Sequence, residues 1–257
     1  MAEPLQIMTV TGPIPASEVK GVISCHEHLF SQSSPFFAAD SSAMEAEGDG
    51  GNESRMAHVS MEILGKLRED PFSVLDNSLV NQEESAQAEM RALLAAGGGL
   101  VVDATPPDCG RNARKLRAAS RLTGVKVVMG CGFGPAHTHP GHLAGETEQD
   151  IAAAMEREII GGAVDSDAHD RIHAGVIGPI GVSDLNEQEL RVLRAASVVQ
   201  KRTACALMIR VSGGVCETAS RSLDAVQAAE GDLSRTCLLG MGASCEDREG
   251  HVRILKR

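Results

Sequence analysis

Residues 97–131, GGGLVVDATPPDCGRNARKLRAASRLTGVKVVMGC, contain the pattern that decides the fold. Two short apolar runs, Leu100–Thr105 and Val125–Cys131, are rich in valine and bounded by glycine or proline, which is typical of buried strands. Between them, Arg111–Leu122 has apolar residues at helical spacing. A strand, a helix and a second strand in this order predict a parallel βαβ unit.

The same alternation continues on both sides of this unit. Further strands are expected at 19–25, 173–180, 204–211 and 236–240, and further helices at 56–67, 82–96, 147–160, 187–202 and 217–229. Six strands without a GxGxxG fingerprint or a P-loop favour an α/β fold of the TIM-type (β/α) barrel over a nucleotide-binding sheet. The small, acidic, glycine-rich residues 38–55 are expected to form a loop that is either a lid or disordered.

The composition limits the classes of partner and compartment. The 257 residues carry 24 Lys and Arg against 35 Asp and Glu, and a net charge of −11 argues against binding nucleic acid or an anionic membrane. No apolar run approaches the roughly 20 residues that span a bilayer, and the N-terminus lacks the pattern of a signal peptide. The seven cysteines are never spaced as CxxC, so we expect a reducing, cytoplasmic location. If the chain is active, its expected partner is a small-molecule substrate.

The most informative candidate site is His26-Glu27-His28, at the end of the first expected strand. Side chains two apart on a strand share a face, so both imidazoles can bind one metal ion, and the carboxyl ends of the strands form the active-site face of a barrel. The alternative to a metal site is that both residues are ordinary loop histidines without a ligand role. Cys25 is expected to be buried, and Asp103 either supports the site or makes a structural hydrogen bond.

A second group of histidines lies in the loop after the strand at 125–131. His137, His139 and His142 are on the same face of the expected barrel and could donate a ligand or contact substrate. A polar loop with unengaged histidines is the favoured alternative.

Six blocks of the chain resemble the phosphotriesterase family of the amidohydrolase superfamily, in the family's order. They are 8–15 (MTVTGPIP), 25–30 (CHEHLF), 97–105, 124–133, 174–181 and 191–196, within a resemblance that spans about 8–244. The resemblance implies one phosphotriesterase-like hydrolase domain over 1–257, built as a TIM barrel. It also implies two divalent metals, usually zinc, that activate water against phosphoester, lactone or related ester and amide bonds.

Carried over residue by residue, the resemblance gives His26 and His28 as metal ligands. It places Pro179 where a carboxylate is expected, and Arg210 and Gly240 where histidines are expected. Proline has no donor atom, and a guanidinium repels a cation. The catalytic and substrate-binding residues stay unassigned.

The family pattern ends near Cys245, which leaves a divergent tail at 245–257. Strands seven and eight are expected to be missing, so the barrel is truncated to about six βα units. Six strands leave two open sheet edges, through which a homo-oligomer could form.

Three hypotheses follow for the function. The first is a zinc-dependent hydrolase of the phosphotriesterase type, impaired because Pro179, Arg210 and Gly240 replace ligands of the family. The second is a catalytically inactive relative that acts as a binding or assembly scaffold, in which Arg210 would bind an anion. The third is a shortened product without independent function. Whether the chain is an enzyme is therefore left open at this point.

Overall fold

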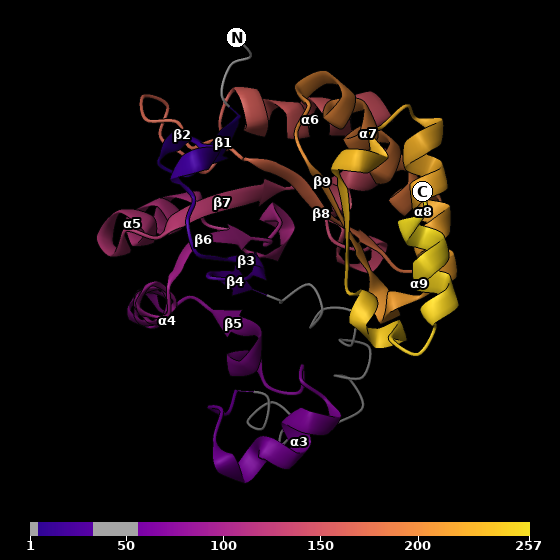
Figure 1. Cartoon of the computed structure of the whole chain (residues 1–257). Coiled ribbons are helices and arrows are strands. Elements are labelled where there is room, and N and C mark those ends of the chain that lie inside the picture. Colours follow the sequence, from indigo (N-terminus) through magenta and orange to yellow (C-terminus); the bar gives the residue numbers. More distant parts are fainter. Residues whose placement is uncertain (1–4, 33–55) are drawn as a thin grey trace.

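A six-stranded parallel sheet, curled into half a barrel, forms the centre of the molecule (Figure 1). The computed structural model describes residues 5–32 and 56–257, so the loop expected at 38–55 lies outside the described residues. The strands, in spatial order, are β10 (Thr236–Leu239), β9 (Leu207–Val211), β8 (Val176–Val182), β7 (Lys126–Cys131), β6 (Gly98–Asp103) and β3 (Val22–Glu27). All six strands expected from the sequence are confirmed.

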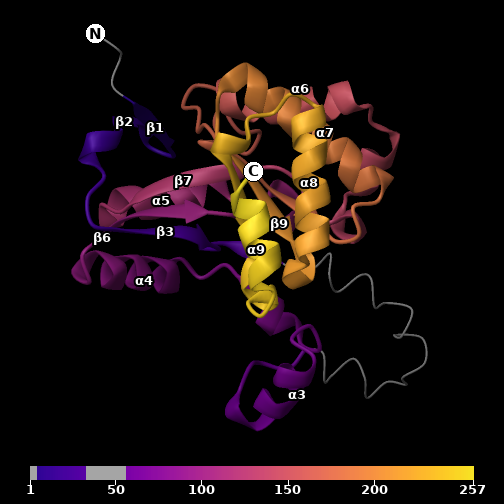
Figure 2. The ribbon, with the colours of Figure 1, turned by 45° about the vertical axis from the view of Figure 1, so that its right-hand side comes forward.

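The helices that follow the strands pack on one face of the curved sheet (Figures 1 and 2). They are α4 (Glu83–Ala95), α5 (Ala113–Thr123), α6 (Glu148–Ile160), α7 (Glu187–Thr203) and α8 (Cys216–Ala228). The helix expected at 56–67 is shorter than predicted, because Ser60 is extended. Only a 3₁₀ turn at Met61–Ile63 and α3 (Leu64–Glu69) form there.

Three elements were not anticipated from the sequence. An antiparallel hairpin of β1 (Gln6–Thr9) and β2 (Gly12–Pro15) lies against the start of β7, where the Val10 amide donates to the Val127 carbonyl oxygen at 2.9 Å. A two-residue pairing joins β4 (Ser31–Gln32) to β5 (Leu79–Val80). Helix α9 (Arg248–Leu255), within the tail expected to be divergent, packs on α8.

Apolar side chains fill both faces of the sheet. The larger cluster joins strand residues such as Ile177 and Ile209 to the covering helices. The smaller cluster lies on the opposite, concave face and consists of strand residues. Its buried members are Leu100, Ala104, Val128, Val176, Met208 and Leu239. Because successive strand side chains alternate between faces, these two clusters define which residues point into the half-barrel.

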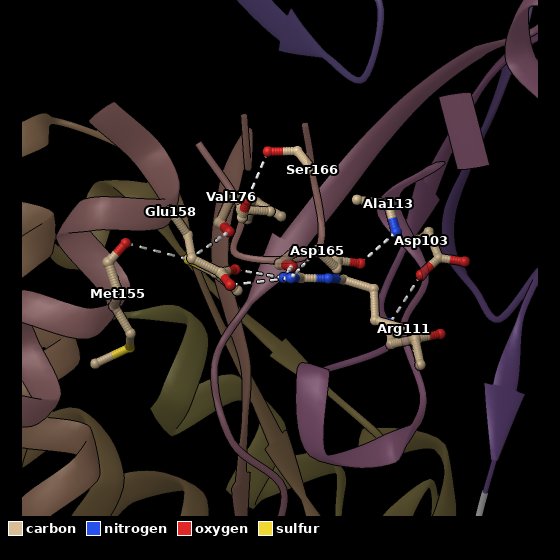
Figure 3. Close-up of polar contacts among 12 residues, drawn as sticks. Asp103, Arg111, Ala113, Met155, Glu158, Asp165, Ser166 and Val176 are labelled. Atoms are coloured by element: carbon tan, nitrogen blue, oxygen red, sulfur yellow. Dashed lines mark hydrogen bonds and ion pairs between the residues drawn. The ribbon is translucent and has the colours of Figure 1, made fainter. Parts of the chain in front are cut away.

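A buried ion pair fixes the loop that follows β6 (Figure 3). Arg111 pairs with Glu158 of α6 and donates to the Gly130 carbonyl oxygen at 2.9 Å and to Asp165 at 3.1 Å. Asp165 also accepts from the backbone amide of Ala113, at the start of α5. The network therefore ties the loop after β6 and the first turn of α5 to β7 and α6.

The two edges of the sheet are β3 and β10, each of which pairs on one side only within the described residues. Cys25 of β3 is exposed, which corrects the expectation that it is buried. The reason is that an edge strand has no neighbour on its outer side. The expected absence of strands seven and eight stays a prediction. No helix in the described residues is both long and apolar enough to span a membrane.

Candidate active site

The structure brings His26 and His28 together at the carboxyl end of β3. Their ring centroids lie 5.2 Å apart in an edge-to-face arrangement. The Nδ1 atom of His28 is 2.9 Å from the hydroxyl of Thr105, a buried residue just after β6. That contact orients the His28 ring and leaves Nε2 as the ring nitrogen available to a ligand or a water.

Asp103 holds the backbone on both sides of this contact. Its carboxylate accepts from the Leu29 amide at 2.8 Å and from the Thr105 amide at 3.1 Å. The side chain is fully buried, and burial raises the pKa of Asp103 to about 6. Asp103 thus makes structural hydrogen bonds that also position the residues around His28, so it combines the two roles left open by the sequence.

Both histidines are neutral at physiological pH. Desolvation by the surrounding walls is the main cause that lowers the pKa of His28 to about 4, although the ring is open to a pocket. Repulsion from His26, when that ring is protonated, and from the Arg210 guanidinium lowers it further. Desolvation and then the charge of Arg210 also lower the pKa of His26. A neutral imidazole can bind a metal, accept a proton or accept a hydrogen bond.

A pocket of about 390 Å³ opens beside His28 at this end of the sheet. Its walls come from the loops after β6 and β7 and from β8 and β9, and they include Cys109, Pro179 and Arg210. Burial raises the pKa of Cys109 to about 12, so this thiol is not an activated nucleophile. The polar side chains that the pocket offers to a ligand are therefore those of His28, Ser31 and Arg210.

The donor atoms present do not fit the two-metal centre that the family resemblance implies. Pro179 lines the pocket without a donor atom, and Arg210 adds a positive charge. Gly240 has a φ of +81°, and a Cβ atom there would lie 2.8 Å from the Val211 carbonyl oxygen, so no larger side chain is accommodated. Across residues 5–32 and 56–257, no cluster of three or more His, Cys, Asp or Glu could hold a metal ion.

The loop histidines do not complete such a centre. The Nε2 atom of His139 is 2.8 Å from the Gly134 carbonyl oxygen, and its ring packs edge-on against Phe133. His142 lies 3.7 Å from Glu146, on an exposed turn.

Sequence reasoning missed Thr105 as the partner of His28. The signal was present, because Thr105 follows a buried strand at the same carboxyl-terminal edge that drew attention to Asp103.

A half-barrel of parallel βα units, with a His-x-His pair at the end of its first parallel strand, is a TIM-barrel-like α/β fold with its candidate site at the strand ends. This chain belongs to the phosphotriesterase family, whose pattern it matches over residues 5–255. The match includes all of α9, beyond the stretch recognised from the sequence blocks.

Its relatives include named hydrolases. The chain is 31% identical to the N-acetyltaurine hydrolase of Danio rerio over 244 residues, which cover 94% of this chain and 66% of that protein. It is 28% identical to the same enzyme of Rattus norvegicus over 246 residues, with 95% and 67% covered. The chain thus spans about two thirds of the length of these relatives.

Two solved structures resemble the fold. A resiniferatoxin-binding protein from Rhodobacter sphaeroides has a TM-score of 0.85 and 34% identity, over 98% of this chain and 67% of that one. A lactonase from Listeria monocytogenes has a TM-score of 0.74 at 17% identity, over 98% and 70%, which shows the fold alone. Nothing in these relatives supports the inactive-scaffold hypothesis.

Proposed function

We propose that this chain is a hydrolase of small-molecule ester or amide bonds, and that its substrate occupies the pocket beside His28. The observation that carries the proposal is the oriented, neutral His28 at the mouth of a pocket of about 390 Å³, at the strand ends where barrel enzymes place their active sites. The family relatives are consistent with it, since N-acetyltaurine is an amide and a lactone is a cyclic ester.

We assign the proton transfer to His28, because the donor set does not fit a two-metal centre. With Nδ1 held by Thr105, Nε2 can accept the proton of a water that attacks the substrate carbonyl carbon. The acyl C–O or C–N bond then breaks, and the protonated His28 returns that proton to the departing oxygen or nitrogen. The Asp103 carboxylate keeps Thr105 and Leu29 in place during this step. A base with a pKa of about 4 is unprotonated at neutral pH but weak, so we expect slow turnover.

The test is a turnover assay on activated esters, lactones and N-acyl amines with the full chain, the His28→Ala variant and a matched control. His169→Ala is the control, because His169 is exposed in the loop before β8. We expect His28→Ala to lower kcat/KM by about 100-fold or more, and His169→Ala to leave it unchanged. Equal turnover by the wild type and His28→Ala, or no turnover of any substrate by the wild type, would contradict the proposal.

A further inference from the structure

Arg210 lies on the concave face of the half-barrel, where it is exposed to solvent. It lies near the end of β9, in register with Gly181 of β8 and Leu239 of β10. Met208, two residues earlier, belongs to the buried cluster of the concave face, whereas Ile209 packs on the helix side. The Arg210 side chain therefore points into the half-barrel, where it lines the pocket together with His28.

The guanidinium of Arg210 has no counter-ion in the part of the chain that the structure describes. Several arginines of this acidic protein pair with carboxylates, among them Arg111 with Glu158, Arg117 with Asp170 and Arg194 with Glu148. Arg210 makes no hydrogen bond or ion pair with any described residue, and no described carboxylate lines the pocket. An unpaired cation in a pocket without acidic groups favours an anionic ligand.

The field of this guanidinium reaches across the pocket. Its positive charge acts on His26 and His28 at the edge strand and on Cys109 in the loop after β6. The same field opposes a divalent cation beside the two histidines. The end of β9 therefore suits a ligand of the opposite charge to a metal.

We infer that Arg210 makes this pocket a binding site for small organic carboxylates, with the carboxylate on the guanidinium and the apolar body against Phe72, Pro106 and Pro135. A guanidinium presents parallel N–H donors that match the two oxygens of a carboxylate. The inference rests on the proposed function only in placing the substrate in this pocket. It adds that the substrate carries a carboxylate group away from the bond that is cleaved.

Binding can be measured without turnover by isothermal titration calorimetry with benzoate as the probe. Benzamide has the same shape but no charge, so it reports the contribution of the anion. The variants are Arg210→Gln, Arg210→Lys and the control Arg221→Gln, which removes the same charge from an exposed position on α8. Circular dichroism checks that each variant is folded.

We expect the wild type to bind benzoate about tenfold or more tightly than benzamide. Arg210→Gln should lose this preference, Arg210→Lys should restore part of it, and Arg221→Gln should keep it. Equal binding of benzoate and benzamide by the wild type, or an unchanged preference in Arg210→Gln, overturns the inference. The comparison between the two probes uses the wild type alone, so a misfolded variant does not prevent a decision.

The two proposals fail separately. Selective benzoate binding in a chain that hydrolyses nothing would support the anion site and reject the hydrolase. Turnover that depends on His28, in a chain that binds benzoate and benzamide equally, would support the hydrolase and reject the anion site.

Discussion

Strands β8 and β3 belong to one sheet but differ in burial, in the number of neighbouring strands and in the regularity of their pairing. All seven residues of β8 are buried, and the strand has a parallel neighbour on each side. None of the six residues of β3, all of them described, is buried; Val22 and Ile23 are 60% and 43% exposed. The pairing of β3 with β6 is also interrupted by two register shifts.

The site histidines nevertheless lie at the exposed edge strand, His26 within β3 and His28 directly after it. Residues that make the fold stable and residues proposed for the chemistry therefore lie on different strands, joined by a few bonds such as those of Asp103. The difference predicts that core substitutions will unfold the chain, whereas substitutions in β3 will change the site at little cost in stability.

The largest effect is expected from Arg111→Met. This change leaves Glu158, on the buried side of the β6–α5 loop, without its cation (Figure 3). Removing one partner of a buried ion pair costs about 3–5 kcal/mol of unfolding free energy. Urea denaturation measures the loss. Arg114→Met, which breaks an exposed pair with Asp167, should cost less than about 1 kcal/mol. Similar losses in both variants would show that the buried network does not support the loop.

A matched pair of isoleucines compares the two strands directly. Ile177 of β8 is fully buried and Ile23 of β3 is 43% exposed. Ile177→Ala should cost about 2–4 kcal/mol through lost burial and a cavity, whereas Ile23→Ala should cost less than about 1 kcal/mol. The measurement is again urea denaturation. A cost for Ile23→Ala equal to that for Ile177→Ala would mean that β3 is buried in solution, by a partner or a second copy of the chain.

Asp103 connects the two regions through its hydrogen bonds, and its titration should make the free energy of unfolding depend on pH. Its native pKa of about 6 lies above the usual aspartate value of 3.8, so between pH 4 and pH 6 the native state keeps a proton that the unfolded state has lost. In this window its contribution to the unfolding free energy falls as pH rises, by about 2–3 kcal/mol in total.

Asp103→Asn removes this titration. The unfolding free energy of the wild type minus that of Asp103→Asn should therefore decrease from pH 4 to pH 6, as measured by urea denaturation at several pH values. A difference that stays constant, or that rises with pH, would mean that the hydrogen bonds from Leu29 and Thr105 outweigh burial.

The sequence predicted the parallel strands because their apolar runs are set locally, by valine-rich segments between glycines and helices. It also predicted the pairing of His26 with His28, which depends only on their spacing along a strand. The exposure of Cys25 was not predictable, because it depends on which strand lies at the edge of the sheet. Helix α9 was missed because its eight residues follow a charged run and pack on α8, a contact absent from the local pattern.

The sequence could not predict that Arg210 has no counter-ion among the described residues, because this too depends on contacts between distant segments. The surroundings of the guanidinium depend on which side chains the loops after β6 and β7 place in the pocket. The sequence suggested an anion at this position only through the resemblance to a family that has histidine there. The pocket supplies the physical argument, since no described carboxylate faces the guanidinium.

The smallest expected effect concerns metal. The edge strand supplies both histidines, whereas Pro179 of β8, Arg210 of β9 and Gly240 after β10 supply no donor. A catalytic zinc site usually needs three protein ligands, so elemental analysis of the purified chain should find well below one zinc per molecule, and a chelator should leave Tm unchanged. His26→Ala is the control and should have the same metal content. One zinc or more per chain, lost in His26→Ala, would show that β3 alone binds the ion. The field of Arg210 would then be too weak to exclude it, and the exposed edge strand would form the chemical centre without the help of the buried strands.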